Sequence, residues 1–153
     1  MEHRRAAGSG SLNHLEHPGQ PSPPLPPPPS DEALVAALRA VSLQPLASRP
    51  GGLDAAADWA AVLSLGEQQR LAFARLLLAK PRLALLDESS SALDAEAEAA
   101  AYAALREAGT TYVSVGHRDS LRQAHARALR IQGDGLGGWA LVELADGAPT
   151  AQR

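Results

Sequence analysis

A short apolar run that ends in two carboxylates constrains this chain more than any other part of its sequence. Residues 83–86 read Leu-Ala-Leu-Leu, with Pro81 upstream and Asp87-Glu88 directly after. A short apolar run that is bounded by a proline on one side and by charged residues on the other is typical of a buried strand. Because ligands of open α/β sheets bind beyond the carboxyl ends of the strands, this strand predicts a site at Asp87 and Glu88.

The two carboxylates permit two interpretations. Mg²⁺ prefers one or two carboxylates plus phosphate oxygens, so Asp87 suits a magnesium ligand, directly or through water. Glu88 would then orient or deprotonate a water for attack on a phosphoryl group. Alternatively, Asp87 and Glu88 simply begin a polar loop, and the pair alone does not decide between the two.

The surrounding segments predict an α/β fold. Helical spacing and capping signals place helices at 31–41, 64–79, 95–108 and 120–126, and β-branched or apolar runs place strands at 83–86, 110–115, 128–131 and 139–144. Strand, helix, strand with short apolar strands is typical of a mostly parallel sheet with an antiparallel edge. The last two strands flank a glycine-rich turn and are expected to form a hairpin.

A second candidate site lies at the start of the helix 64–79. Ser64 and Glu67 have the spacing of a capping box, which alone explains both side chains. The alternative is a phosphate site, because a helix N-terminus with a hydroxyl and a glycine, here Gly66, allows phosphate to approach the backbone.

The third candidate is His117, just past the strand 110–115. If this strand runs parallel to 83–86, His117 shares the carboxyl edge with Asp87 and Glu88. There it can hydrogen-bond a γ-phosphate and the attacking water; otherwise it is a surface-loop histidine. The other histidines lack metal-ligand spacing and are His3, His14, His17 and His125.

Together these motifs resemble the ATP-binding domain of ABC transporters. Residues 63–70 resemble the signature motif, 83–88 the Walker B motif with its catalytic glutamate, and 91–94 the D-loop, while His117 falls at the switch histidine. The resemblance implies part of a P-loop NTPase fold. It also implies nucleotide contacts by Ser64, Gly66, Glu67, Gln68 and Asp94, magnesium binding by Asp87, and catalytic roles for Glu88 and His117.

The details of two motifs resemble subfamily D and its bacterial and plastid relatives. The first detail is Gly116-His117-Arg118 around the switch histidine, with His125 soon after. The second is a signature motif in which Leu65 replaces a glycine and Glu67 a glutamine. This resemblance implies a fatty-acyl cargo and a plastid or peroxisomal compartment. It also implies two partners, namely ABC transmembrane domains and a second ATP-binding domain arranged head to tail.

The chain contains no Walker A loop, which requires G-x-x-x-x-G-K-[ST]. Its single lysine, Lys80, lies between Ala79 and Pro81. We therefore expect ATP and Mg²⁺ to bind only if a partner or a missing segment supplies a Walker A loop. The resemblance then implies that Ser64, Gly66 and Glu67 act in trans on a partner's nucleotide. Without the strand that leads to Walker A, the sheet is expected to have unpaired edges and exposed apolar faces.

Composition sets the domain boundaries. Eight of the twelve prolines lie between Pro18 and Pro29, so residues 1–30 are expected to be a disordered tail. The partial ATPase domain covers 31–145, with a helical-subdomain part at 31–80 and a catalytic-core part at 81–145, and 146–153 form a second tail.

Composition also limits the function. The chain has no cysteine, which excludes thiolate metal sites, and its net charge of −3 argues against nucleic-acid binding. No apolar stretch is long enough to span a membrane, so membrane association is expected through partner domains or through a segment missing from this chain. The leading interpretation is a segment of a transporter ATPase that is inactive by itself. The alternative is an inactive interaction module that pairs with a full-length ABC partner and regulates it.

Overall fold

The computed structural model describes residues 27–132 and 137–144 of the chain. The elements, in order, are α1 (Asp31–Ala40), the 3₁₀ helices η1 (Gln44–Ser48) and η2 (Gly52–Asp54), α2 (Trp59–Val62), α3 (Leu65–Ala79), β1 (Leu83–Asp87), α4 (Ala95–Glu107), β2 (Thr111–Val115), η3 (Asp119–Ala124), β3 (Arg127–Ile131) and β4 (Trp139–Glu143). Nearly all of the expected tail at 1–30, and all of that at 146–153, lies outside the described residues.

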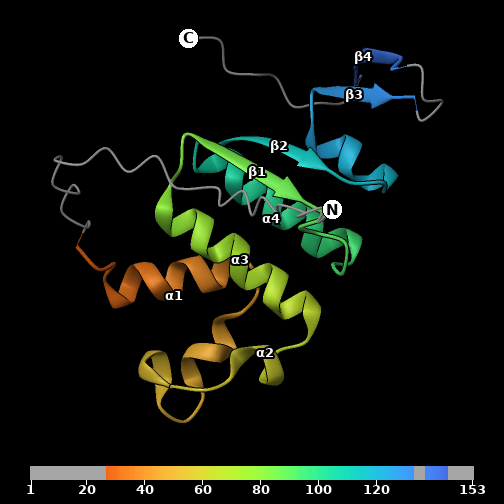
Figure 1. Cartoon of the computed structure of the whole chain (residues 1–153). Coiled ribbons are helices and arrows are strands. Elements are labelled where there is room, and N and C mark those ends of the chain that lie inside the picture. Colours follow the sequence, from red (N-terminus) through yellow and green to blue (C-terminus); the bar gives the residue numbers. More distant parts are fainter. Residues whose placement is uncertain (1–26, 133–136, 145–153) are drawn as a thin grey trace, which may run out of the picture.

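The strands β1 and β2 pair in parallel, with Leu83 opposite Thr111 and Asp87 opposite Val115. Helix α4 connects them, and α3 precedes β1. Figure 1 shows α3 and α4 lying beneath the two strands. The strand–helix–strand order expected from the sequence is therefore present, and both strands end at the same edge.

The core lies between this sheet and its helices. The largest fully buried side chains are Phe73 of α3 and Tyr102 and Leu105 of α4. The rings of Phe73 and Tyr102 meet edge to face with centroids 5.6 Å apart, a favourable aromatic geometry. Ala84 and Leu86 of β1 complete the core from the strand side.

The opposite face of β1 and β2 is exposed. Side chains alternate along a strand, so Leu83, Leu85, Val113 and Val115 point away from α3 and α4. Each of them is more than half exposed, and Leu85 is 76% exposed. The prediction of a buried strand at 83–86 is thus wrong for one face, because no element among residues 27–132 and 137–144 covers it. The exposed apolar face that was expected is present.

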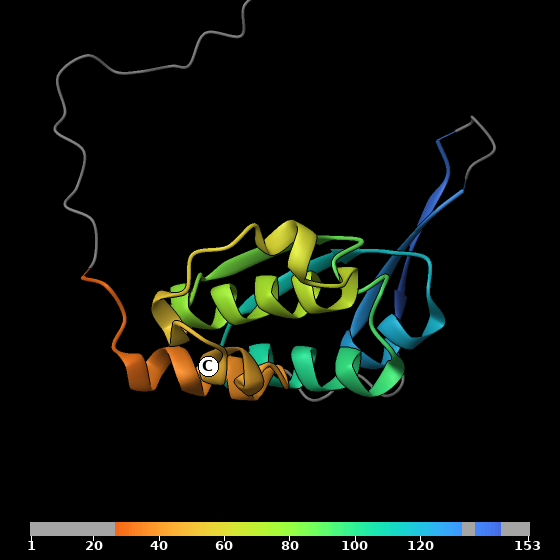
Figure 2. The same ribbon diagram turned by 90° about the horizontal axis from the view of Figure 1, so that it is seen from below.

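The hairpin forms a sheet of its own. β3 and β4 pair antiparallel, with Leu129 opposite Leu141 and Ile131 opposite Trp139. Within the described residues they make no ladder with β1 or β2, so the antiparallel edge predicted for a single sheet is wrong. Figure 2 shows the hairpin projecting from the end of the helical layer.

One helix differs in type from the prediction. The segment expected to be a short α-helix at 120–126 is the 3₁₀ helix η3, which ends before His125. Its turns are closed by short-range bonds such as Leu121 N–H to Arg118 O, 3.2 Å. Since β3 begins at Arg127, only a short tight helix fits between β2 and the hairpin.

Candidate functional site

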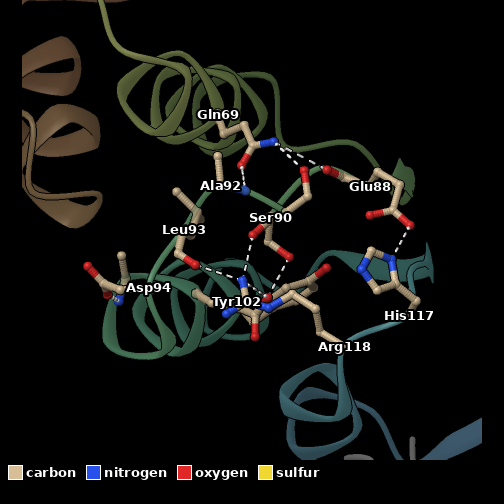
Figure 3. A network of polar contacts seen from close by, with 12 residues as sticks. Gln69, Glu88, Ser90, Ala92, Leu93, Asp94, Tyr102, His117 and Arg118 are labelled. Carbon is tan, nitrogen blue, oxygen red and sulfur yellow. Dashed lines mark hydrogen bonds and ion pairs between the residues drawn. The ribbon is translucent and has the colours of Figure 1, made fainter.

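The carboxyl ends of β1 and β2 bring two of the predicted residues together. His117 Nδ1 lies 3.1 Å from Glu88 Oε1 (Figure 3). Parallel pairing of β1 with β2 places both residues at one edge of the sheet, because Glu88 directly follows β1 and His117 is the second residue after β2. The side chain of His117 is 79% exposed and that of Glu88 45%, so the pair is accessible to a ligand. A carboxylate beside an imidazole at this position can hold and orient a water molecule.

The backbone of Glu88 is unusual. Its φ is +46°, in the left-handed region that non-glycine residues rarely adopt, while its N–H donates to Val115 O at 3.0 Å. Such a conformation costs about 1–3 kcal/mol and persists only where the surrounding structure holds it, here through the bond to Val115. The conformation directs the chain away from β1 at the residue predicted to be catalytic.

Asp87 ends β1 on the exposed face of the sheet, next to Glu88. A single exposed carboxylate fits the few protein ligands that Mg²⁺ requires when phosphate oxygens and water supply the others. No group of three or more His, Cys, Asp or Glu side chains that could hold a metal ion occurs in the described part of the chain. The residues present therefore fit a magnesium ion that arrives with a nucleotide.

The signature segment is organised by a complete capping box. Glu67 N–H donates to Ser64 Oγ at 3.3 Å, and Ser64 N–H donates to Glu67 Oε2 at 2.9 Å. The Ser64 hydroxyl also donates to Glu67 Oε2, at 2.8 Å. These bonds, the one from the backbone N–H first, lower the pKa of Glu67. The capping interpretation is thus confirmed, and it leaves the exposed Ser64 at a helix N-terminus.

Gln68 and Asp94, which the resemblance places at the nucleotide, are also bonded within the chain. Gln68 Nε2 donates to Leu63 O at 2.9 Å and to Ala60 O at 3.1 Å. Asp94 caps α4 by accepting from Ala97 N–H at 2.7 Å. Both side chains therefore fix local backbone geometry.

Two residues inside the recognised motifs have contacts that the sequence did not predict. Gln69 of α3 bonds to the loop after β1, and Arg118 bonds to the same loop from beyond β2 (Figure 3). In the sequence, only their positions next to the predicted site residues Gln68 and His117 could have drawn attention to them.

His125 has a structural role in this arrangement. Its Nδ1 lies 2.7 Å from Leu121 O, so the ring donates there, and Nε2 lies 3.0 Å from Ser114 Oγ, within hydrogen-bond distance. The ring also packs edge to face on Tyr102 and Tyr112. His125 therefore ties η3 to β2 behind the site.

Comparison with known proteins identifies the class. The family model described as ABC transporter matches residues 12–91, more than half of the chain. An uncharacterized ABC transporter ATP-binding protein from Synechocystis is 51% identical over 69% of this chain and 16% of its own length. The chloroplastic ABC transporter D family member 2 of Arabidopsis thaliana is 56% identical over 64% of this chain and 14% of its own. The lysosomal cobalamin transporter ABCD4 of Mus musculus is 46% identical over 74% of this chain and 19% of its own length.

These matches define an α/β ATP-binding domain of the P-loop NTPase class. The chain belongs to the ABC transporter family, and its relatives include members of subfamily D and bacterial ATP-binding proteins. It spans about a sixth of the length of these curated relatives. Among the described helices, none is long and apolar enough to cross a bilayer.

Proposed function

We propose that this chain contributes the signature, Walker B, D-loop and switch-histidine elements of an ABC ATPase to ATP-driven transmembrane transport. The observation that carries the proposal is the 3.1 Å contact between Glu88 and His117 at the common edge of β1 and β2. In this arrangement Glu88 orients the attacking water, and His117 supports Glu88 and contacts the γ-phosphate. Asp87 would hold a magnesium ion, which would neutralise charge on the phosphates when bound.

The signature would act on a different nucleotide from the one that Glu88 serves. Ser64 and Gly66 lie at the positive end of α3, where backbone N–H groups favour an anion. In a head-to-tail pair of ATP-binding domains, this helix end covers ATP held on the partner's Walker A loop. Ser64, Gly66 and Glu67 then contribute in trans, together with Gln68 and Asp94 nearby.

The 153-residue chain contains no Gly-Lys pair, so it has no lysine positioned to bind the β- and γ-phosphates. We infer that it does not hydrolyse ATP by itself. Asp87, Glu88 and His117 become active only when a Walker A loop is supplied at their edge of the sheet. The partners are ABC transmembrane domains and a second ATP-binding domain, and any contact with the membrane is through them.

The proposed cargo is of the fatty-acyl type, on the subfamily-D resemblance alone. One subfamily-D relative is named a cobalamin transporter and another a chloroplastic protein, so neither cargo nor compartment transfers directly.

An ATPase measurement tests the proposal. The purified chain is assayed with Mg²⁺ and ATP, alone and with a full-length relative such as the Arabidopsis protein. We expect no turnover by the chain alone and a changed rate for the relative when the chain is added. Clear magnesium-dependent turnover by the isolated chain would contradict the proposal. An unchanged rate for the relative would contradict the role in trans.

A further inference from the structure

The loop between β1 and α4, residues 88–94, is held from two sides by side chains distant in sequence. Gln69 reaches it from α3, and Arg118 reaches it from the segment after β2 (Figure 3). The loop begins with Glu88 and ends with Asp94, the cap of α4. Its conformation therefore determines where the Glu88 carboxylate lies relative to the rest of the fold.

Gln69 uses both ends of its amide on this loop. Its Nε2 donates to Ser91 Oγ at 3.0 Å and to Glu88 O at 3.3 Å, and its Oε1 accepts from Ala92 N–H at 2.9 Å. Rotating the amide by half a turn would place its NH₂ against the Ala92 N–H, a donor against a donor. The side chain is thus fixed in one orientation.

Gly66 brings the same two parts of the chain together. A Cβ added at Gly66 would lie 3.0 Å from the carbonyl oxygen of Ala92, closer than such contacts normally are. A glycine here allows the first turn of α3 to pack directly on loop 88–94. This packing is a second role for a glycine that the sequence assigned to phosphate approach.

Arg118 holds the loop from the other side. Its Nη1 donates to Leu93 O at 2.6 Å and to Ser90 O at 3.0 Å, and it lies 3.6 Å from Glu98 Oε2. Glu98 is buried and also accepts from the Ser90 hydroxyl at 2.7 Å. Hydrogen bonds from a guanidinium are about twice as strong as neutral ones, so this is the stronger of the two attachments.

We propose that Gln69 and Arg118 are positioning residues that clamp loop 88–94, so that Ser64 and Glu88 keep one fixed geometry. Gln69 connects the helix that begins beside Ser64 with the carbonyl of Glu88. Arg118 follows His117, so it connects the other member of the Glu88–His117 pair to the same loop. The clamp makes the signature end of α3 and the hydrolytic edge of the sheet a single rigid unit. The catalytic part of this inference rests on the proposed function.

Amide exchange in the full-length chain, followed by NMR, tests the clamp without any nucleotide. In Gln69→Met, the amide of Ala92 loses its acceptor, and we expect it to exchange about tenfold faster or more. In Gln69→Glu, the acceptor oxygen for Ala92 remains but the donor to Glu88 O and Ser91 Oγ is lost, so exchange at Ala92 should rise less than in Gln69→Met. Gln123→Met, on the exposed surface of η3, is the matched control and leaves the loop unchanged.

Exchange at Ala92 that is unaltered in Gln69→Met would overturn the clamp. Exchange that rises equally throughout α3 would also overturn it, because Gln69 would then serve only the stability of its helix. The amide N–H of Leu93 donates to Ser90 O, one of the two carbonyls that Arg118 holds, so Arg118→Met is expected to increase exchange of this N–H. Arg122→Met is its control, since Arg122 pairs only with exposed Asp119 in the described structure.

Turnover of the full-length relative in the presence of each variant tests the positioning role. We expect Gln69→Met to lower the chain-dependent change in kcat about tenfold, with a KM for ATP within about twofold of the original value. A shift in KM alone, or an unchanged kcat, would overturn this role. If the unaltered chain has no effect on the relative, the proposed function fails, and amide exchange alone then decides whether the clamp exists.

Discussion

The two faces of the sheet formed by β1 and β2 differ sharply although they come from the same ten residues. One face packs on α3 and α4, where Tyr102 is 1% and Leu105 0% exposed. The other presents Leu85 and Val115, which are 76% and 62% exposed. Parallel sheets are normally covered on both faces. The packed face therefore stabilises the chain, and the open face contributes little to its stability.

The difference also separates the site into two parts. Asp87 lies on the open face at the end of β1, whereas Glu88 turns into loop 88–94 and is held through Gln69 and Arg118. The edge of the sheet that carries Glu88 and His117 is thus supported from the helical side and open on the other. An arrangement of this kind suits a site that is completed by a second element.

The largest effect is expected in the packed face. Leu105→Ala removes a fully buried side chain from between α4 and the sheet. The loss of burial and the remaining cavity should lower the free energy of unfolding by about 2–5 kcal/mol. Chemical denaturation of the full-length variant measures this. A change below about 1 kcal/mol would mean that the packed face does not dominate stability.

The corresponding truncation on the open face should have a much smaller effect. Leu85→Ala changes a side chain that is already 76% exposed, so the free energy of unfolding should move by no more than about 0.5 kcal/mol. The same denaturation experiment applies, with Leu105→Ala as the reference. A loss as large as that of Leu105→Ala would show that the open face is covered in solution, for example by self-association.

The smallest effect lies outside both faces, at the start of α3. Hydrogen bonds from Ser64 hold the pKa of Glu67 below its ordinary value of 4.5. A carboxylate with a lowered pKa contributes stability above its unfolded pKa, and this contribution disappears as pH falls through the lowered folded pKa. The stability difference between the unaltered chain and Glu67→Gln should therefore be larger at pH 6 than at pH 3. A difference that does not depend on pH would contradict the ionised capping box.

Local signals in the sequence predicted most of the elements. The capping box at Ser64, the stop at Gly109 and the β-branched run predicted at 110–115 each have a short-range cause, and each element is present, the strand as Thr111–Val115. Parallel pairing also follows, because a helix of adequate length connects the two strands.

The remaining features depend on distant contacts. The composition of 83–86 does not reveal that one face of this strand is uncovered, since burial is decided by other elements. The hydrogen bonds of Gln69 join residues 19 to 23 positions apart, and those of Arg118 join residues 25 and 28 apart. No local pattern indicates such pairs, so only the folded chain reveals the clamp.

A pair of variants tests the central claim most directly, through the effect of the chain on the magnesium-dependent ATPase rate of a full-length relative. If the chain acts in trans through its signature, Ser64→Ala should abolish most of its effect, about tenfold or more. Glu88→Gln should leave the effect largely intact. The 153 residues contain no Walker A lysine to hold a nucleotide beside Glu88, so this carboxylate has no phosphate to act on. The opposite result, with Ser64→Ala silent and Glu88→Gln inactive, would contradict the account.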